Sequence, residues 1–277
     1  MDPLKQAISL SETELDEILA CVHNLYGFDL QAYRRASLSR RVNRIMQVHG
    51  FGFYDLRHEL LNNPKFFNTF LEEITVNVTE MFRDPQFYPA LAEKVLPYLG
   101  TYPFIRCWSA GCSTGEEVFS LAIFLQEHGL YNRSFIYGTD INSSVVAKAK
   151  SAIFPADTIR FYADNYRKSG LQKSLLDYFT VSYQAATIRN ELKSNVLFSQ
   201  HNLADGGVFN EFQLILCRNV FIYFEPELQR RVTDLFYRSL CPHGFLCLGS
   251  REILDPSDMR KRFRLIDAAS QIYQKVA

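Results

Sequence analysis

The stretch that decides the fold is FIRCWSAGCSTGEE, residues 104–117. It opens with apolar residues typical of a buried strand: Phe104, Ile105, Cys107 and Trp108. The small residues from Ser109 to Gly115 then predict a turn whose backbone can approach a ligand closely. The helix predicted next, residues 116–128, would direct its N-terminal amides at this turn, which suits a polar cofactor. Gly111 and Gly115 form G-x-x-x-G, which is neither a dinucleotide fingerprint nor a Walker phosphate loop.

The composition narrows the classes of protein to which the chain can belong. Its 277 residues predict one large domain or two unequal ones. Lysine plus arginine equals aspartate plus glutamate at 30 each, and this balance disfavours nucleic-acid binding. The first residues resemble neither a signal nor a transit peptide, and no apolar run could span a bilayer. We therefore expect a soluble, cytoplasmic protein that does not insert into membranes, and a monomer.

The cysteines indicate neither a metal site nor disulfides. None of them forms a C-x-x-C motif, and several lie in apolar runs that resemble strands: Cys21, Cys107, Cys112, Cys217, Cys241 and Cys247. We predict buried free thiols and no bound metal.

Residues 1–75 are predicted to form a small all-helical domain. Ser11 and Glu14 make a capping box, and the helix that follows can end at Gly27. Three more segments carry apolar residues at helical spacing: Leu38, Val42, Ile45 and Met46; Leu56, Leu60 and Leu61; and Phe66, Phe67, Phe70, Leu71 and Ile74.

Arginines cluster on the second of these helices. Arg40, Arg41 and Arg44 share an arc of roughly 100° beside its apolar face, and Arg34 and Arg35 add charge at its start. The cluster can be a solvated helix face. It can also be a docking surface for an acidic partner, because clustered arginines focus a positive potential even on a neutral protein.

Residues 76–84 are predicted to be a linker. Asp84 followed by Pro85 predicts the N-cap and first turn of the next helix. The polar groups of Asn77, Thr79 and Arg83 can be ordinary surface groups. Because they precede the small-residue turn, they can also close over a cofactor bound there.

The rest of the chain predicts strands alternating with helices. A strand from Ser134 to Thr139 ends at Asp140, near the interval at which an acidic residue commonly meets ribose hydroxyls. A helix at about 142–151 then completes a β-α-β-α unit, the start of a doubly wound parallel sheet. Further strands are predicted at 196–200, 212–217 and 245–248, with a helix at 226–240. The closing strands, 263–266 and 272–276, are too close in sequence for a crossover helix and should pair antiparallel. Short runs at 178–182 and 185–189 predict an inserted hairpin.

Five segments, in this order, closely resemble the chemotaxis receptor methyltransferases of the CheR family: NVTEMFRD, WSAGCSTGEEVFSLA, YGTDIN, FSQHNL and LCRNVFIYF. The resemblance covers nearly the full chain. It implies a protein-glutamate O-methyltransferase that transfers methyl from S-adenosylmethionine (SAM) to the cytoplasmic helices of chemotaxis receptors, with S-adenosylhomocysteine as the product.

The resemblance also implies the fold class. This is an α/β class I methyltransferase, a Rossmann-like doubly wound sheet with an antiparallel last strand pair. It would follow a small all-α N-terminal domain at 1–75 and the linker at 76–84. The methyltransferase domain would span 85–277 and carry a small antiparallel β-subdomain at about 175–195.

The implied site residues fall in the five segments. The cofactor contacts would be Asn77, Thr79, Arg83, Glu117, Asp140, Asn202, Leu203, Arg218 and Asn219. Arg83 and Tyr223 would serve catalysis, Arg83 by pairing with the cofactor carboxylate and Tyr223 by lying near the transfer site. Asp140 can accept from ribose hydroxyls, and Asn202 can bond the adenine edge or the ribose.

Simpler interpretations remain for three of these residues. The helix macrodipole alone favours Glu117 near a helix start, Asp140 can cap the next helix, and Arg218 can form a structural ion pair.

A glutamate substrate removes the need for a general base, because its carboxyl group, with an ordinary pKa of about 4.3, is already ionised. The site must align the carboxylate oxygen, methyl carbon and sulfur and exclude water. A neutral Tyr223 hydroxyl suits that orienting role.

One departure from the family pattern concerns partner choice. Family members that tether to a receptor's C-terminal pentapeptide have a longer, glycine-containing loop in the β-subdomain, whereas TVSYQAATIRNELKSN is short and lacks glycine. This predicts the tether-independent type, with Arg40, Arg41 and Arg44 docking the acidic receptor helices. Two alternatives stay open: a noncatalytic adaptor that binds SAM or a receptor, and a methyltransferase for a small molecule or nucleic acid. The neutral charge and the lack of an NPPY-type motif disfavour the latter.

Overall fold

The computed structural model describes residues 10–276, apart from the side chains of 258–260. Residues 1–9, on which the interpretation of the N-terminus partly rests, lie outside that range. The chain divides into two compact units, which we describe separately. One comprises Met1–Val76 with Tyr223–Gln229, and the other Asn77–Ile222 with Arg230–Ala277.

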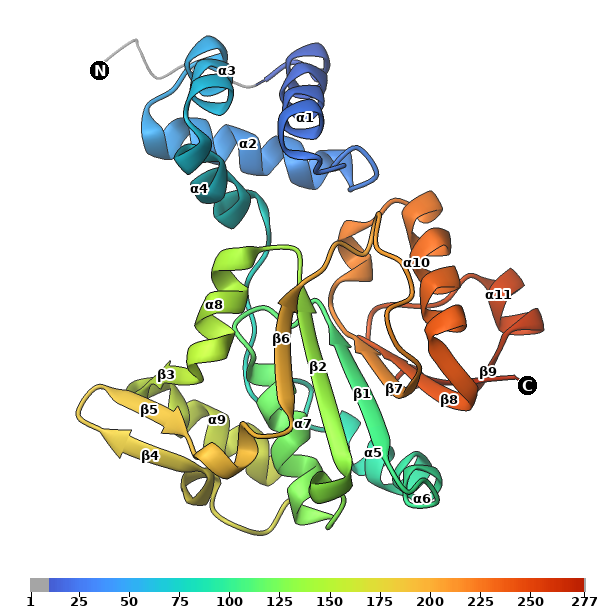
Figure 1. Cartoon of the computed structure of the whole chain (residues 1–277). Helices are drawn as coiled ribbons and strands as arrows, with labels where there is room; N and C mark the ends of the chain where they lie inside the picture. Colours follow the sequence, from blue (N-terminus) through green and yellow to red (C-terminus); the bar gives the residue numbers. More distant parts are fainter. Residues whose placement is uncertain (1–9, 277) are drawn as a thin grey trace. The chain divides into compact units, whose positions relative to one another are not determined.

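The first unit is helical, as predicted (Figure 1). Its helices are α1 (Glu12–Tyr26), α2 (Arg35–His49), α3 (Phe53–Asn62) and α4 (Pro64–Ile74). The predicted capping box is confirmed, because Ser11 N–H donates to Glu14 Oε2 at 2.8 Å and Glu14 N–H donates to Ser11 Oγ at 3.3 Å. α1 and α2 end at Gly27 and Gly50, both in the left-handed conformation that glycine adopts without strain.

The apolar faces of these helices form one core. Nearly all the residues singled out for their helical spacing are buried there, including Val42, Leu56 and Phe70. Leu61 is the exception and is 45% exposed, because it lies one position off the buried stripe of α3.

The second unit is built on a seven-stranded sheet. Its strand order is β6-β2-β1-β7-β8-β10-β9. The strands are β1 (Ile105–Ala110), β2 (Ser134–Asp140), β6 (Val196–Gln200), β7 (Phe212–Cys217), β8 (Leu240–Leu248), β9 (Phe263–Asp267) and β10 (Ile272–Lys275). The first five run parallel, whereas β10 pairs antiparallel with both β8 and β9. This order confirms the predicted doubly wound sheet with an antiparallel last pair.

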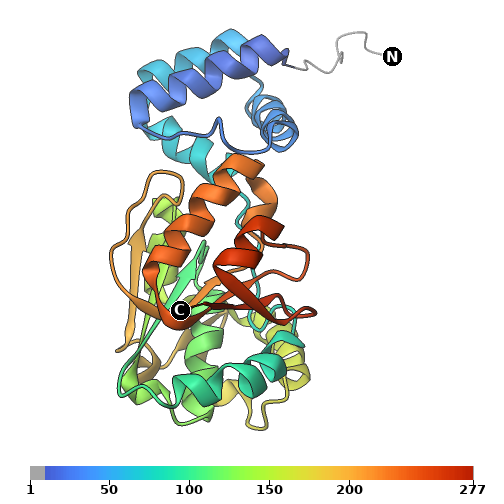
Figure 2. The ribbon, with the colours of Figure 1, turned by 90° about the vertical axis from the view of Figure 1, so that its right-hand side faces the viewer.

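Helices cover both faces of this sheet (Figures 1 and 2). The helices of the second unit are α5 (Phe87–Lys94), α6 (Leu96–Leu99), α7 (Glu116–Glu127), α8 (Ser143–Ser151), α9 (Ala156–Lys168), α10 (Pro226–Ser239), whose first residues belong to the first unit, and α11 (Pro256–Lys261). One buried cluster joins α5, α7, α8 and α9 to sheet residues such as Cys107 and Leu216. On β1, Trp108 packs against Phe236 of α10, with ring centroids 5.3 Å apart.

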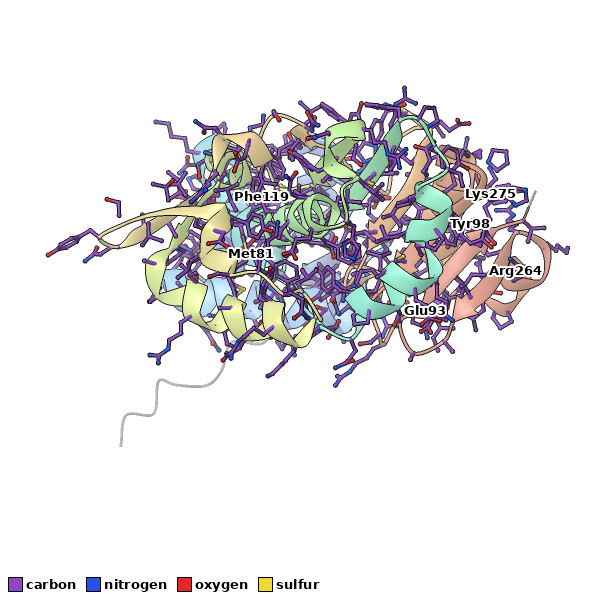
Figure 3. The ribbon with its side chains drawn as sticks, turned by 90° about the horizontal axis from the view of Figure 1, so that it is seen from below. Met81, Glu93, Tyr98, Phe119, Arg264 and Lys275 are labelled. Atoms are coloured by element: carbon purple, nitrogen blue, oxygen red, sulfur yellow. The ribbon has the colours of Figure 1, made fainter. Side chains whose placement is uncertain are left out.

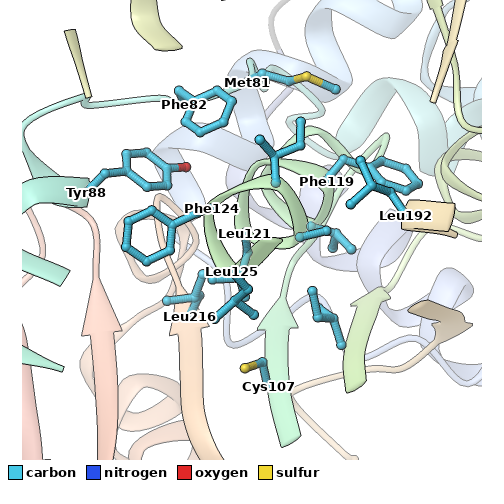
Figure 4. Packing of buried hydrophobic residues seen from close by; sticks show 14 of the residues in the cluster. Met81, Phe82, Tyr88, Cys107, Phe119, Leu121, Phe124, Leu125, Leu192 and Leu216 are labelled. Carbon is cyan, nitrogen blue, oxygen red and sulfur yellow. The ribbon is translucent and has the colours of Figure 1, made fainter. Parts of the chain in front are cut away.

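α7 lies at the centre of that larger cluster. Figure 4 shows Leu121 and Leu125 directed toward the strands of Cys107 and Leu216, with Phe82 on the other side of the helix. Figure 3 looks along α7 from below, with Met81 and Phe119 beside it, while Arg264 and Lys275 mark the β9 and β10 end of the sheet. Because α7 is packed on all sides, the turn at its N-terminus is fixed in place.

A separate three-stranded antiparallel sheet has the order β3-β5-β4. The predicted hairpin is confirmed as β4 (Phe179–Ser182) and β5 (Ala185–Ile188), joined by Tyr183 and Gln184. Tyr183 is 98% exposed and adopts φ 48°. The third strand, β3 (Ile153–Pro155), was not predicted, because three residues carry too little periodicity to be identified.

Several predicted boundaries were wrong. Phe104 lies outside β1 and is 45% exposed, whereas Ser109 and Ala110 belong to the strand rather than to the turn. β8 begins at Leu240 instead of Phe245, because its pairing with β7 already starts at Phe212. Sheet partners set these limits, and they are not visible in the local sequence.

Five of the six cysteines are buried free thiols, as predicted, and Cys21 is half-buried. Within residues 10–276, no helix has the length and apolar character needed to cross a bilayer.

Candidate active site

The turn after β1 is shaped by positive φ angles at Gly111, Ser113 and Gly115. A Cβ on Gly111 would lie 2.5 Å from Val220 Cγ2, so this position requires glycine both for its φ of 81° and for space. The amides of Gly111 and Cys112 both donate to Thr139 O, at 2.7 and 2.9 Å. These two amides therefore hold the turn against β2.

Asp140 lies at the end of β2 and is 9% exposed. Its Oδ2 accepts from Ser113 N–H at 2.9 Å, and its Oδ1 accepts from Asn142 N–H at 3.0 Å. Burial raises the pKa of the Asp140 carboxyl above its ordinary value, although these amides oppose the rise. Each oxygen keeps acceptor capacity for a further donor, such as a sugar hydroxyl. The cap of α8 is Asn142, whose Oδ1 accepts from Ser144 N–H at 2.9 Å.

Ser113 connects Asp140 to the linker. Its backbone N–H donates a hydrogen bond to Asp140 Oδ2, and its Oγ donates to Asn77 O at 3.1 Å. Asn77 and Thr79 are half-buried, and Arg83 Nη1 donates to Val78 O at 3.3 Å. The segment that follows Val76 is thus bound to the turn that precedes α7.

Arg218 is the centre of a buried ionic cluster. Its side chain is 2% exposed and pairs with Asp84 Oδ2 at 2.9 Å and with Glu117 Oε2 at 3.4 Å. The same guanidinium donates to Arg83 O at 3.0 Å and lies 4.3 Å from the centroid of the Phe87 ring. The interpretation of Arg218 as an ion pair is therefore supported, and the pair fixes the backbone of Arg83.

Glu117 faces this cluster from the first turn of α7. Ser109 Oγ donates to Glu117 Oε1 at 2.8 Å. Burial raises the pKa of the Glu117 carboxyl, and the charge of Arg218 opposes the rise. Its side chain is 15% exposed, and its other carboxylate oxygen, Oε2, accepts from Arg218 Nη1 at 3.4 Å.

The prediction that Asp84 caps the next helix was wrong. α5 begins at Phe87, and its N-cap is Gln86. Asp84 adopts φ 51°, and its side chain pairs with Arg218 instead. Asp84 therefore joins the site residues, and the sequence did not reveal this because Arg218 lies 134 positions away.

The loop after β6 carries Asn202 and the buried Leu203. His201 N–H donates to Asp140 O at 3.0 Å, which places this loop beside the end of β2. The Asn202 side chain is used within the loop, because its Nδ2 donates to Asp205 Oδ2 and its Oδ1 accepts from Ala204 N–H. Any ligand contact of Asn202 must share or replace these bonds.

Asn219 follows Arg218 and adopts φ 62°, in the left-handed region that asparagine tolerates. Its Oδ1 is buried and has no hydrogen-bond partner among the residues that the structure describes. Its backbone N–H donates to Glu252 Oε2 at 2.8 Å. Glu252 belongs to none of the motifs found in the sequence, so this contact could not be predicted.

The structure therefore brings most predicted cofactor contacts to the carboxyl ends of the parallel strands β1, β2, β6 and β7. Open α/β sheets bind ligands at this edge. The turn contains small residues, the carboxylates keep spare acceptor capacity, and the buried Asn219 Oδ1 has no partner within the described residues. These features fit a cofactor with several hydrogen-bond donors.

The remaining predicted residues belong to the first compact unit. Tyr223 ends a short 3-10 segment, and its carbonyl accepts from Arg34 N–H at 2.8 Å. Arg40 and Arg44 are exposed on α2. Arg41 is half-buried, and its Nη1 donates to Glu73 O and Thr75 O at 3.4 and 3.2 Å.

Known protein families account for most of the chain. Residues 13–75 match the family model described as CheR methyltransferase, all-alpha domain. Residues 77–272 match the model described as CheR methyltransferase, SAM binding domain.

Individual relatives give the same assignment. A Pseudomonas putida protein with the provisional name methyltransferase Cher3 is 40% identical over 96% of this chain and 97% of its own length. The chemotaxis protein methyltransferase of Salmonella typhimurium is 30% identical, over 90% of this chain and 86% of its own length. That of Borreliella burgdorferi is 29% identical, over 89% and 90%. The SAM-binding family model identifies SAM as the cofactor, and the chain belongs to the CheR methyltransferase family.

Proposed function

We propose that this protein transfers the methyl group of SAM to glutamate side chains of chemotaxis receptors, forming methyl esters. The observation that carries the proposal is the match of the chain to both family models. The segment that follows Val76 supports it, because Ser113 and Arg218 bind that segment to the strand ends. The names of the Salmonella and Borreliella relatives support chemotaxis as the setting.

SAM, when bound, supplies a methyl carbon that a substrate carboxylate oxygen can attack. In this proposal Asp140 accepts from the ribose hydroxyls, and Arg83 pairs with the carboxylate of the cofactor. Glu117 faces its amino group, while Asn77, Thr79, Asn202, Leu203, Arg218 and Asn219 complete the contacts. Arg218 would act indirectly, by holding the residues that contact the cofactor. Its own guanidinium already bonds to Asp84, Glu117 and Arg83 O.

The substrate carboxylate is ionised at neutral pH, so the residues of this chain need only orient it and exclude water. Thiols do not compete as nucleophiles, because burial raises the pKa of the neighbouring Cys112 and Cys217 well above the ordinary value. We assign the orienting role to the Tyr223 hydroxyl.

Exposed charge on α2 supports receptor docking. Arg40 and Arg44 form no ion pair within the described part of the chain and would face the acidic helices of a receptor. Arg41 is occupied by the end of α4, so we assign it the supporting role of holding the helix. The short hairpin supports docking without a pentapeptide tether.

The proposal is tested by incubating the protein with methyl-labelled SAM and membranes that contain receptors. Base treatment should release labelled methanol, because methyl esters hydrolyse in base whereas methylated amines and nucleic acids do not. A variant with exposed Asp157→Ala should behave as wild type. Binding of SAM without methanol release would indicate an adaptor. Labelling that is stable in base would indicate another class of methyl acceptor.

A further inference from the structure

The segment after β7 is held in place by the side chain of a distant residue. Residues 219–222 leave the sheet in a turn that begins with Asn219 in the left-handed region. Backbone amides in such a turn point inward and make a concavity that attracts an anion. Here the anion is part of the chain itself, the carboxylate of Glu252.

Glu252 is 3% exposed and lies just beyond β8. Its Oε2 accepts from Asn219 N–H at 2.8 Å and from Gly249 N–H at 2.6 Å, and its Oε1 accepts from Ile222 N–H at 3.2 Å. It forms no ion pair with any residue in the described part of the chain. The N–H dipoles of the turn therefore stabilise the charge of the Glu252 carboxylate.

The fit around this carboxylate is tight. A Cβ on Gly249 would lie 2.7 Å from Glu252 Oε2 and 2.9 Å from Asn219 N. Since β7 and β8 are parallel neighbours with Cys217 opposite Leu248, their carboxyl ends bring Asn219 and Glu252 together. Only an ionised carboxyl group offers two acceptor oxygens to several donors; a glutamine would turn an NH₂ group toward some of these amides.

We propose that Glu252 is a positioning residue: it holds the 219–222 turn so that the buried Oδ1 of Asn219, which has no partner among the described residues, is fixed toward the cofactor. This inference rests on the placement of Asn219 in the cofactor site under the proposed function. Neither Glu252 nor its contact with the turn followed from any motif. Its effect on the cofactor is indirect, through the backbone of Asn219.

The test measures SAM affinity by calorimetry and thermal stability for four proteins: wild type, Glu252→Gln, Asn219→Ala and the double variant. Glu252→Gln should weaken SAM binding by about tenfold or more, the effect of one lost or mispaired buried hydrogen bond. In the Asn219→Ala background the same substitution should change affinity by less than about twofold, because the two residues act as one unit. Glu93→Gln, an exposed glutamate on α5, is the matched control and should change nothing.

Gly249→Ala supplies a second perturbation that leaves no uncompensated charge, and it decides the matter if Glu252→Gln does not fold. As a single substitution, Gly249→Ala should weaken SAM binding. Added to Asn219→Ala, it should cause no further loss. Wild-type affinity in folded Glu252→Gln, or additive losses in the double variant, would overturn the inference. So would wild-type affinity in Asn219→Ala.

The SAM affinities of these variants do not depend on which molecule accepts the methyl group. A protein that shows the expected pattern of SAM affinities but releases no methanol from receptors contradicts the proposed substrate and leaves the role of Glu252 standing. Conversely, methanol release with additive losses contradicts only the role of Glu252.

Discussion

Asp140 is the residue whose environment best fits cofactor binding, because it is buried yet has acceptor capacity left. Replacing it with alanine should weaken SAM binding by about 1 to 3 kcal/mol, the range for a lost hydrogen bond to a buried charged group. Stability should also fall, because the amides of Ser113 and Asn142 lose their acceptor. Calorimetry on the folded variant decides the first effect and urea unfolding the second. Unchanged affinity would remove Asp140 from the site.

Arg83 and Tyr223 should separate binding from turnover. Arg83→Ala should raise the Kd for SAM, since it removes the proposed partner of the cofactor carboxylate. Tyr223→Phe should leave that Kd near normal and lower kcat about tenfold, which corresponds to about 1.4 kcal/mol on the barrier. A Tyr223→Phe protein with full turnover would show that the hydroxyl has no part in the reaction.

The buried carboxyl of Glu116 makes the stability of the protein depend on pH, and this can be measured separately from the ion pairs of Arg218. Glu116 is 6% exposed and accepts from Thr114 Oγ1 at 2.6 Å and from Tyr162 OH at 3.4 Å. Burial raises the pKa of its carboxyl above the ordinary 4.5, so the folded state binds this proton more tightly than the unfolded state. The stability that Glu116 contributes is therefore fully present below its ordinary pKa of 4.5. It is lost as the pH rises through the pKa of Glu116 in the folded state.

Glu116→Gln stays neutral throughout, so its free energy of unfolding should increase relative to wild type between about pH 4 and pH 8. Urea unfolding at several pH values measures the difference. A constant gap, or a gap of the opposite slope, would contradict the raised pKa.

At the level of elements, the Arg218 cluster joins the segment before α5 to the ends of β1 and β7. Two residues of that segment, Phe82 and Asp84, have positive φ, and Ser120 Oγ accepts from Phe82 N–H at 2.9 Å. Such strained conformations persist only where surrounding contacts hold them. The planar, charged guanidinium of Arg218 contacts three groups here: Asp84, Glu117 and the carbonyl of Arg83.

Arg218→Lys should therefore loosen this segment while the rest of the sheet stays folded, because a lysine cannot reproduce the fork of hydrogen bonds or the packing on Phe87. Hydrogen exchange should speed up in peptides covering residues 78–86 and stay unchanged in the β4–β5 hairpin. The exposed Arg231→Lys serves as the matched control. Equal exchange in the 78–86 peptides of wild type and variant would show that other contacts suffice.

For the whole molecule, the question is how a substrate protein is captured. Arg40→Glu with Arg44→Glu should abolish receptor methylation and leave SAM affinity intact, since neither side chain belongs to the cofactor site. Wild-type methylation should fall as salt rises, because exposed charges are screened over roughly 8 to 10 Å. Deleting a receptor's C-terminal pentapeptide should have little effect.

Arg167→Glu with Lys168→Glu on α9 makes the same change in net charge on another exposed helix and is the matched control. If both double variants lose activity equally, net charge and not the α2 face controls docking. If pentapeptide removal abolishes methylation, the protein is of the tethered type.

Features governed by neighbours in sequence were determined by the sequence alone. The capping box at Ser11, the end of α1 at Gly27, and the bounds of β6 and β7 follow from local hydrogen bonding and from the periods of helix and strand. The parallel direction of the first five strands followed from alternating strands and helices. The identity of the family rested on five such local segments.

Only the tertiary structure decided what buried polar groups do. Asp84 was predicted to be a helix cap but pairs with Arg218. Glu252 belongs to no sequence motif, yet it binds the 219–222 turn. Arg41 belongs to a charged stripe in the sequence, yet it is bound to the end of α4. A buried charge must find a partner wherever the chain brings one, and that partner is set by the fold and not by distance along the sequence.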